Sequence, residues 1–374
     1  MRILHVLGKL DRGGAETWLV QLLRHTDRRE YEMDFIVHSE QPAAYDEEVR
    51  ALGARIFPCL SPSEPLRYAR NFRRILQATG PYDVVHSHVH HFSGYVLMLA
   101  ALCGVPIRIA HSHSDTRSVE QDRGRVRRAY LAAMQKMIQT FATGGLTVSS
   151  EAGDDLFAAN WRKSPRWKLH HLGIDLSRFS IPVDRQAIRR ELGLPEGARV
   201  IGHVGRFNEQ KNHAFLVEIA REIVQREPRA VFLLVGGGPL RETTERLVRA
   251  FGLEKNFRFA GLRPDIPALM TGAMDAFLFP SLYEGLPIAL LEAQAAGLHC
   301  VISKTISPEA DVVPDLIVRE ALTAAPYTWA NHVLNQLSRT DFMEFPAIRE
   351  RMNERSIETS SERLLSLYAS FSSI

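Results

Sequence analysis

The sequence predicts an α/β protein built from two parallel sheets, each covered by helices. Three observations support this prediction. The chain has 374 residues, which is more than one ordinary hydrophobic core serves. Short apolar segments alternate with amphipathic helical patterns from one end to the other, as is typical of parallel-sheet architecture. The alternation runs twice, with a break near Leu172–Phe179.

The first run predicts one sheet within residues 1–172. Amphipathic patterns place helices at Ala15–Arg24 and Arg67–Gln77, between apolar segments short enough to be strands. A further helix, Arg125–Phe141, carries an apolar stripe that we expect to pack on this sheet. The strands are expected at Arg2–Leu7, Met33–Val37, Arg55–Pro58, Asp83–His86, Ile107–Ala110 and Gly145–Val148.

The second run predicts another sheet within residues 173–354. Its helices are expected at His213–Arg226, Arg241–Phe251 and Ile288–Ala296. Residues 355–374 contain one last amphipathic helix, expected at Ser356–Tyr368. The strands are expected at Val200–Val204, Val231–Val235, Phe257–Phe259, Ala276–Phe279 and Cys300–Ile302.

Composition excludes several classes of protein. A hydrophobic content of 45% with 24% charged residues is typical of globular chains. Three cysteines, Cys59, Cys103 and Cys300, stand far apart without metal-ligand spacing, so we expect a reducing, cytoplasmic location without disulfides or a zinc site. The longest uncharged segment, Val84–Ile107, contains four histidines, two glycines and a proline, and predicts no membrane helix. The first residues read as a strand, without a signal peptide.

Positive charge is concentrated in the first half. Residues 1–172 contain 23 Lys+Arg and 18 Asp+Glu, and the rest contains 23 and 25, so the formal charges are +5 and −2. This asymmetry favours an anionic partner for the first half. No nucleic-acid-binding motif accompanies it, so nucleic acid is not expected to be a partner.

Glycine-rich loops follow two of the expected strands. Gly13 and Gly14 open a helix after the first strand, and Gly236 and Gly237 begin a Gly-Gly-Gly-Pro turn. Glycine lets the backbone approach a phosphate closely, and a helix N-terminus favours negative charge. Each loop could equally be a simple strand-to-helix turn, and the dinucleotide pattern GxGxxG is absent.

Charged residues follow two strands of the second half. Arg206 and Lys211 stand five residues apart after Val200–Val204 and can converge on a diphosphate, although a solvated basic loop is the alternative. Glu284 stands in a loop, and Glu292 lies within the apolar face of the helix that follows. A buried carboxylate is costly unless it lines a cleft or pairs with hydroxyl donors.

The ordered set of motifs resembles the retaining glycosyltransferases of family four. It consists of Gly-Gly-Ala-Glu at 13–16, Gly-Arg…Lys at 205–211, Gly-Gly-Gly-Pro at 236–239 and the pair Glu284-x7-Glu292. Residues 108–113 and 303–309 look like those of bacterial capsular and exopolysaccharide transferases. The resemblance spans nearly the whole chain and implies the GT-B fold: two Rossmann-like domains facing across a deep cleft, with a C-terminal helix that crosses back to the first domain. It also implies transfer of a sugar from a UDP- or GDP-linked donor to an acceptor hydroxyl in polysaccharide or glycolipid synthesis.

The resemblance also implies a role for each motif residue. Arg206 and Lys211 would bind the diphosphate, Glu284 the donor-sugar hydroxyls, and Glu292 the nucleotide ribose. The acceptor-side histidine is expected at His113, with His111 as second candidate, and we expect the two side chains to alternate so that only one points inward. The other residues expected at the site are Gly13, Gly14, Gly236, Gly237, Gly285 and Leu286 for the donor, and His86 and His88 for the acceptor.

Neither a cofactor nor a metal is expected. Histidines 86, 88, 90 and 91 look like a metal cluster, but the family pattern favours a loop that lines the acceptor pocket. No Asp-x-Asp pair is available for a nucleotide-bound divalent ion. The leaving diphosphate would then be stabilised by Arg206, Lys211 and helix N-termini.

Two further expectations concern partners and rival functions. The basic rim of the helix Arg125–Phe141 suits reversible peripheral contact with the inner face of the cell membrane, where a lipid-linked acceptor is presented. One rival function is a nucleotide-sugar epimerase of the same fold, which would act without an acceptor. The other is a non-catalytic nucleotide-sugar-binding protein, which the intact charged motif residues disfavour.

Overall fold

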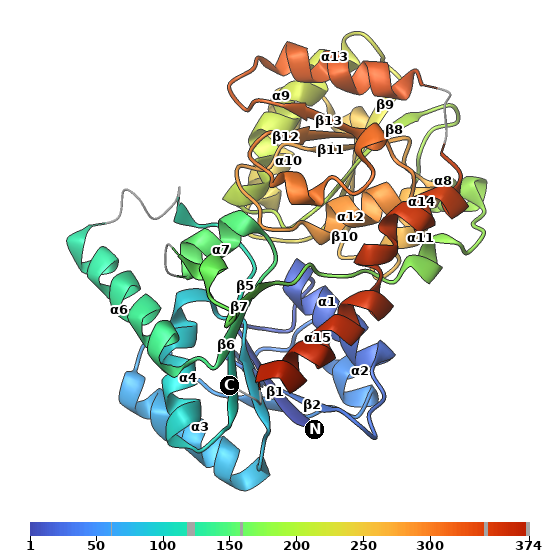
Figure 1. The fold of residues 1–374 in the computed structure, drawn as a ribbon. Coiled ribbons are helices and arrows are strands. Elements are labelled where there is room, and N and C mark those ends of the chain that lie inside the picture. The colour runs from blue at the N-terminus through green and yellow to red at the C-terminus, as the bar shows by residue number, and fades with distance from the viewer. Residues whose placement is uncertain (61, 118–123, 158–159, 340–342, 372–374) are drawn as a thin grey trace. The chain divides into compact units, whose positions relative to one another are not determined.

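The computed structural model describes the chain apart from residues 61, 118–123, 158–159, 340–342 and 372–374. It divides into two units, Met1–Gly173 with Ile357–Ile374, and Ile174–Ser356. Each unit is built around one parallel sheet (Figure 1). We refer to them as unit 1 and unit 2.

Unit 1 has a seven-stranded sheet in the order β3-β2-β1-β4-β5-β6-β7, with every neighbouring pair parallel. The first strand of the chain therefore lies inside the sheet, and the chain order reverses between β1 and β4. The strands are β1 (Arg2–Leu7), β2 (Glu32–Val37), β3 (Ile56–Pro58), β4 (Val84–Ser87), β5 (Ile107–Ser112), β6 (Gly144–Thr147) and β7 (Trp167–Leu169).

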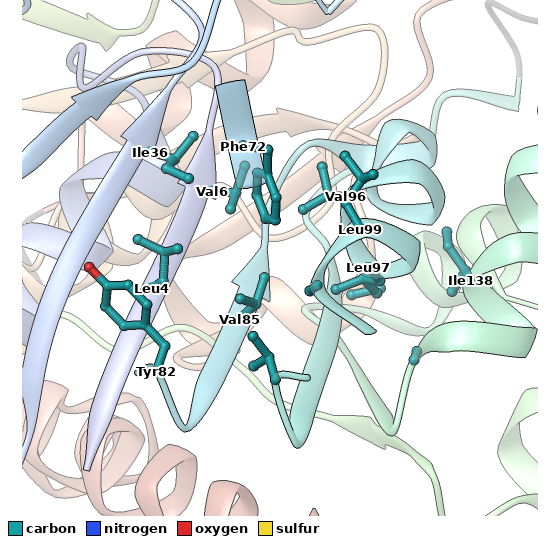
Figure 2. Packing of buried hydrophobic residues seen from close by; sticks show 14 of the residues in the cluster. Leu4, Val6, Ile36, Phe72, Tyr82, Val85, Val96, Leu97, Leu99 and Ile138 are labelled. Carbon is teal, nitrogen blue, oxygen red and sulfur yellow. The ribbon is translucent and has the colours of Figure 1, made fainter. Parts of the chain in front are cut away.

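One face of this sheet carries the apolar core of unit 1. Figure 2 shows Leu4, Val6 and Val85 of the strands beside Phe72 of α3 and the side chains of α4. The strand side chains alternate onto one face because a strand has a period of two. The helices of unit 1 are α1 (Gly14–His25), α2 (Asp46–Ala51), α3 (Pro65–Thr79), α4 (Ser93–Leu102), α6 (Arg125–Phe141), α7 (Ser150–Leu156) and α15 (Ile357–Phe371).

The C-terminal helix α15 belongs to unit 1, as the family resemblance implied. It packs beside α1, and the Trp18 indole donates to the Ser360 hydroxyl at 3.2 Å. The Tyr368 hydroxyl lies 2.7 Å from Nδ1 of His86 in β4. The second face of the sheet is thus covered by α1 and α15, and its contacts are polar as well as apolar.

Helix α6 departs from the prediction. Its C-terminal part packs on α4, where Ile138 is buried, but Val126 and Tyr130 are 86% and 37% exposed. The expectation that the whole stripe packs on the sheet was therefore wrong. Helix α6 is longer than the surface on which it packs. Its first turns therefore extend into solvent, together with the arginines Arg125, Arg127 and Arg128.

Unit 2 has a six-stranded parallel sheet in the order β10-β9-β8-β11-β12-β13. Its central strands are continuous apolar runs because helices cover both faces of a parallel sheet. In β9 all six residues are buried. The strands are β8 (Arg199–Val204), β9 (Ala230–Val235), β10 (Phe257–Gly261), β11 (Ala276–Phe279), β12 (Cys300–Ser303) and β13 (Ile317–Glu320).

The helices of unit 2 alternate with these strands. The edge strands β7 of unit 1 and β13 of unit 2 were not among the expected strands: two of the three residues of β7 are exposed, and no residue of β13 is fully buried. The expected helices also left out α13, which buries Trp329 and Val333. The helices are α8 (Arg185–Glu191), α9 (His213–Val224), α10 (Arg241–Ala250), α11 (Ile266–Gly272), α12 (Ile288–Ala295), α13 (Pro326–Leu337) and α14 (Phe345–Met352).

Candidate functional site

The predicted donor residues lie at the carboxyl edge of the unit 2 sheet. In that sheet β8 and β11 are neighbours, and the chain order reverses between them. Loops that leave such a switch point diverge to opposite faces and expose backbone amides between them, which is where open α/β sheets bind ligands. The loop after β8 carries Arg206 and Lys211, and the loop after β11 carries Glu284.

Lys211 and Glu284 form an ion pair that joins the two loops. The distance from Nζ to Oε1 is 2.5 Å, and the side chains are only 14% and 7% exposed. Gln210 reinforces the contact, because its Nε2 donates to Glu284 Oε2 at 3.2 Å and to the carbonyl of Tyr283 at 3.0 Å. The amide of Leu282 donates back to the Gln210 carbonyl at 2.8 Å. The two loops therefore form one preorganised, charged structure.

Arg206 differs from Lys211 in having no internal partner. It is exposed, and its guanidinium forms no ion pair with a described residue. An exposed arginine beside a fixed ion pair contributes little to the fold and is free to bind an anion through two hydrogen bonds.

The glycine triplet packs against the Arg206 loop. Gly236 and Gly238 have φ angles of 143° and 149°, which side chains rarely adopt. A Cβ on Gly236 would come within 2.1 Å of the Gly205 carbonyl oxygen, and the Phe207 amide donates to the Gly237 carbonyl at 2.9 Å. The close approach that triple glycine provides is thus made to this chain's own backbone, and its first effect is to position Arg206.

Two free amide donors lie in the loop just before α12. Gly285 and Leu286 are buried, yet their amides donate to no acceptor among the described residues. Free amides at a helix N-terminus favour an anion, both by hydrogen bonding and through the helix dipole. The residues predicted to approach the diphosphate here thus have the necessary hydrogen-bonding capacity.

Glu292 lies further along α12 and is 7% exposed. Burial raises the pKa of its carboxyl from 4.5 to about 7, an effect that the nearby Arg178 partly opposes. A carboxyl group with such a pKa can exchange hydrogen bonds with ligand hydroxyls in either protonation state.

Two buried histidines near these loops were not predicted as site residues. In His203 of β8 only Nδ1 has a partner, the carbonyl of Leu278 at 2.9 Å, while neither ring nitrogen of His213 has one among the described residues. Burial lowers the pKa of His203 well below 6.5 and that of His213 to about 4. Both are therefore neutral. The sequence did contain a signal for His203, which is a polar residue within an otherwise apolar strand.

The corresponding edge of unit 1 begins with the Gly13-Gly14 loop after β1. Gly13 is the residue before α1, and a Cβ there would come within 2.3 Å of the Glu16 carboxylate. Gly14 is the exposed first residue of the helix. That carboxylate is the end of a flexible side chain and Gly13 has an ordinary φ of −114°, so the turn does not require glycine there. Gly14 is the exposed glycine that a ligand can approach.

Five histidines in or just after three strands of unit 1 lie on one face of the sheet: His5 in β1, His86 in β4, His111 in β5, and His88 and His113 just beyond the last two strands. Three ring pairs are in contact: His5 Nδ1 with His88 Nε2 at 3.1 Å, His86 Nε2 with His111 Nδ1 at 3.1 Å, and His88 Nδ1 with His113 Nε2 at 2.8 Å. Burial lowers every one of their pKa values, to about 3 for His5 and His113, so the rings are neutral. We refer to these five residues as the histidine cluster.

The expected alternation of His111 and His113 was wrong. Strand β5 continues to Ser112, two residues beyond the predicted end, and residues two apart in a strand point to the same face. The two ring centroids are 4.1 Å apart, and both rings lie against Trp18. Orientation therefore does not distinguish the two histidines, but burial does, because His111 is fully buried and His113 is half-buried.

His86 is not accessible to an acceptor in this structure. It is fully buried, and both ring nitrogens have partners, Tyr368 on one side and His111 on the other. Of the four predicted acceptor histidines, His88 and His113 keep partial exposure. Three residues here were not predicted: His5, a member of the histidine cluster, and Trp18 and Tyr368, which contact it. His5 had a signal, as a polar residue in a buried strand, whereas Tyr368 contacts the cluster only through the fold.

Both halves of the chain match models of glycosyltransferase families. Residues 184–354 match the model described as glycosyl transferases group 1, and residues 13–173 match that of a glycosyl transferase 4-like domain. A protein of Bacillus subtilis (strain 168) that is named as a glycosyltransferase, EpsF, is 37% identical over 337 residues, which cover 89% of this chain and 86% of that protein.

Other relatives have more specific names. The capsular polysaccharide biosynthesis glycosyltransferase CapH of Staphylococcus aureus is 26% identical, covering 92% of this chain and 93% of the relative. An Escherichia coli α-1,3-galactosyltransferase, named for UDP-Gal and α-D-GlcNAc-diphosphoundecaprenol, is 30% identical over 59% of this chain and 58% of its own. Among solved structures, Anabaena HepE in complex with UDP-glucose is similar with a TM-score of 0.82 at 17% identity, covering 99% of this chain and 100% of that one. The likeness confirms the predicted fold class.

Proposed function

This chain belongs to the family-four, group 1 glycosyltransferases of the GT-B fold, and we propose that it transfers a sugar from a UDP-linked donor to a hydroxyl of a saccharide or lipid-linked acceptor. Names of relatives support the two substrate classes. HepE binds UDP-glucose, the E. coli relative is named for a lipid-diphosphate acceptor, and CapH is named for capsular polysaccharide biosynthesis. These relatives are named for sugar transfer or sugar-nucleotide binding, and none favours an epimerase.

The Lys211–Glu284 pair is the observation that supports the donor site best. It fixes a cation and a carboxylate side by side at the switch point of unit 2, with Arg206 exposed on the Lys211 loop and free amides just before α12. In the proposed complex Arg206, Lys211 and the amides of Gly285 and Leu286 bind the diphosphate. Glu284 accepts hydrogen bonds from the donor sugar. Glu292 binds the ribose.

This arrangement favours a mechanism without a protein nucleophile. The carboxylate of Glu284 already accepts from Lys211 and Gln210, which leaves it poorly suited to attack an anomeric carbon. In the proposed step the bond from the anomeric carbon to the diphosphate breaks, and the acceptor oxygen bonds to the same face of that carbon. The acceptor proton passes to the leaving diphosphate oxygen. Arg206, Lys211 and the amides of Gly285 and Leu286 stabilise the negative charge that develops there, so no metal is required.

Unit 1 supplies the acceptor side in this proposal. The half-buried His113 and His88 present neutral rings at the ends of β5 and β4, at the edge of the sheet where the exposed Gly14 begins α1. A neutral imidazole has one donor and one acceptor nitrogen, so it can either donate a hydrogen bond to a sugar hydroxyl or accept one from it. We propose His113 as the residue that contacts the reacting sugar.

We also propose reversible contact between α6 and an anionic membrane surface. The exposed Val126 and Tyr130 stand among the exposed Arg125, Arg127 and Arg128, a combination suited to acidic lipid head groups. None of the helices in the described part of the chain is long and apolar enough to span a membrane. Sedimentation with anionic vesicles, and loss of binding in Arg127→Glu/Arg128→Glu, would support this contact at the inner face of the cell membrane.

A panel of nucleotide-sugars tests the function directly. UDP-glucose, UDP-galactose, UDP-N-acetylglucosamine and GDP-mannose are compared by thermal shift, and we expect one UDP-sugar to raise the melting temperature most. That donor is then incubated with and without lipid-diphosphate acceptors, in the presence of a chelator. Transfer that survives the chelator supports the proposal. Conversion of the donor without acceptor would indicate an epimerase, and a strict requirement for manganese would overturn the metal-independent mechanism.

A further inference from the structure

Three members of the histidine cluster are arranged like a set of metal ligands. One ring nitrogen from each of His88, His111 and His113 lies within 4.8 Å of the other two. The ring centroids of His88 are 5.1 Å from His113 and 5.4 Å from His111. Rings bound tetrahedrally through Zn–N bonds of about 2.0–2.1 Å have centroids roughly 5 Å apart, so two of the three separations already suit a shared ion.

Free nitrogens point to the same conclusion. Nε2 of His111 and Nδ1 of His113 are buried without a hydrogen-bond partner among the described residues. A buried polar atom left unpaired costs roughly 1–3 kcal/mol, so native proteins rarely keep such atoms together without a ligand.

The other two members of the histidine cluster, His5 and His86, contact the ring nitrogens of the proposed ligands that would not bind the ion. Nδ1 of His111 contacts His86, whose other nitrogen contacts the Tyr368 hydroxyl, and Nε2 of His88 contacts His5. Metal-binding histidines are usually held in this way, with the second ring nitrogen fixed by a neighbour. The face of the sheet thus holds both a set of ligands and the groups that orient them.

We propose that His88, His111 and His113 bind one divalent transition-metal ion, with Zn²⁺ as the reference, at the carboxyl ends of β4 and β5. Three imidazole ligands with a fourth position open are an established zinc arrangement. The sequence predicted no metal site, because only the strand register brings these side chains together.

Two neighbouring sets of side chains compete for this assignment. His5, His86 and His88 also bring ligand atoms within 4.8 Å, but two members of that set, His5 and His86, are fully buried, whereas in the proposed set only His111 is. His90, His91 and Asp155 form a third set. There Asp155 already accepts from the amide and hydroxyl of Thr116 at 2.6 and 2.8 Å. The set with His113 combines the partial exposure of His88 and His113 with unpaired nitrogens on His111 and His113. Nδ1 of His88 would have to exchange its 2.8 Å contact with His113 Nε2 for a bond to the ion.

The proposal does not depend on sugar transfer, although it shares His113 with the proposed acceptor site. Binding of Zn²⁺ is therefore measured on the full chain in the absence of nucleotide and acceptor. The protein is stripped with chelator, dialysed and titrated with Zn²⁺ against a chromophoric chelator, and separately with Co²⁺, whose visible absorption reports tetrahedral nitrogen ligands.

We expect one ion per chain and a tetrahedral Co²⁺ spectrum. His88→Gln and His113→Gln should each weaken binding by about 100-fold or more, beyond the roughly 10-fold expected for His5→Gln, an outer partner. The matched control His90→Gln should bind like the wild type. Circular dichroism and UDP-sugar binding by unit 2 verify that each variant is folded.

Several results would overturn the assignment. They are loss of binding in His5→Gln with His113→Gln unaffected, loss in Asp155→Asn, equal affinity in all variants, and no binding by the wild type. A transfer assay separates this question from the proposed function. If both proposals hold, Zn²⁺ inhibits transfer, whereas transfer without Zn²⁺ binding leaves the function standing and removes the metal site.

Discussion

The two sheets share a topology but differ in chemistry at corresponding edges. Each runs outward in both directions from its first strand, with the switch point between β1 and β4 in unit 1 and between β8 and β11 in unit 2. Beyond the unit 2 switch lie an ion pair, an exposed arginine and free amides. Beyond the unit 1 switch lie five neutral histidines, three of them fully buried.

The difference shows that the fold determines where a site lies and the loop residues determine what it binds. A diphosphate carries concentrated negative charge, so the edge that holds it needs cations fixed before binding. An acceptor hydroxyl is neutral, so it needs groups that donate or accept hydrogen bonds without charge. In this interpretation unit 2 binds by charge and unit 1 by neutral hydrogen bonding.

This contrast depends most on Lys211, and Lys211→Met should have the largest effect. The substitution leaves Glu284 buried without its cation, and breaking a buried pair costs about 3–5 kcal/mol. We expect a lower melting temperature and a loss of kcat/KM of at least about 100-fold, since the diphosphate loses a cation. The control is the double variant Lys211→Met/Glu284→Gln, which should recover stability but not activity. Recovery of both would show that the pair is structural only.

Glu292→Gln should make the protein more stable at neutral pH. The pKa in the fold, about 7, lies above the ordinary 4.5, so the carboxyl favours folding while protonated, and this contribution is lost as pH rises through 7. The gain from glutamine should be absent near pH 4.5 and reach roughly 3 kcal/mol above pH 7, because a tenfold change in proton affinity corresponds to about 1.4 kcal/mol. Denaturant unfolding at pH 5 and pH 8 measures it.

The same variant should bind UDP more weakly, because glutamine replaces one of the two acceptor oxygens of the carboxylate with an NH₂ group that only donates. Stability and affinity would then change in opposite directions. A variant that is less stable at pH 8, or one that binds UDP normally, contradicts the assignment of Glu292 as a buried ligand group.

Arg206→Ala should weaken donor binding without weakening the fold. The guanidinium has no ion-pair partner among the described residues, so its removal leaves no buried group unpaired. In calorimetric titration we expect the binding free energy for a UDP-sugar to weaken by about 2 kcal/mol, which is the contribution of one hydrogen bond to a charged group. Arg246→Ala, a change at another exposed arginine of unit 2, is the control and should bind normally. Equal affinity of both variants would remove Arg206 from the donor site.

Much of this arrangement was predictable from sequence because strands and loops have strong local signals. The apolar run of β9 and the order of charged motifs located both the sheet and the donor loops. Pairing between distant residues was not predictable. Nothing local links Lys211 to Glu284, 73 residues away, and only the adjacency of β8 and β11 brings them together.

The fold explains one interpretation in a way that the sequence could not, and shows another to be wrong. Triple glycine at 236–238 indicated close backbone approach, but its partner is the Gly205–Phe207 backbone, a long-range contact without a sequence signature. The histidines of β5 were expected to alternate, although residues two apart share a face. With that corrected, His111 and His113 could have been placed on one face from sequence alone. The helix α15 that covers this face could not.

The smallest effect, and the finest distinction within unit 1, concerns His113 and His111. Both rings lie on the same face, 4.1 Å apart, but only His113 is partly exposed. If His113 hydrogen-bonds the reacting sugar, His113→Ala should lower kcat by about tenfold, equal to roughly 1.4 kcal/mol, and leave the KM for donor nearly unchanged because the diphosphate ligands are in unit 2. His113→Asn keeps a donor and should recover part of the rate.

His111→Ala should behave differently, because it removes a fully buried ring that contacts His86 and Trp18. Its main effect should be a lower melting temperature, with kcat largely kept. Kinetics and melting curves of the two variants, measured side by side without added metal, decide between them. A greater kcat loss in His111→Ala would transfer the role to His111, and wild-type rates in both would remove it from β5. Because the two side chains differ in burial and not in direction, only this split between rate and stability distinguishes a substrate contact from a core residue.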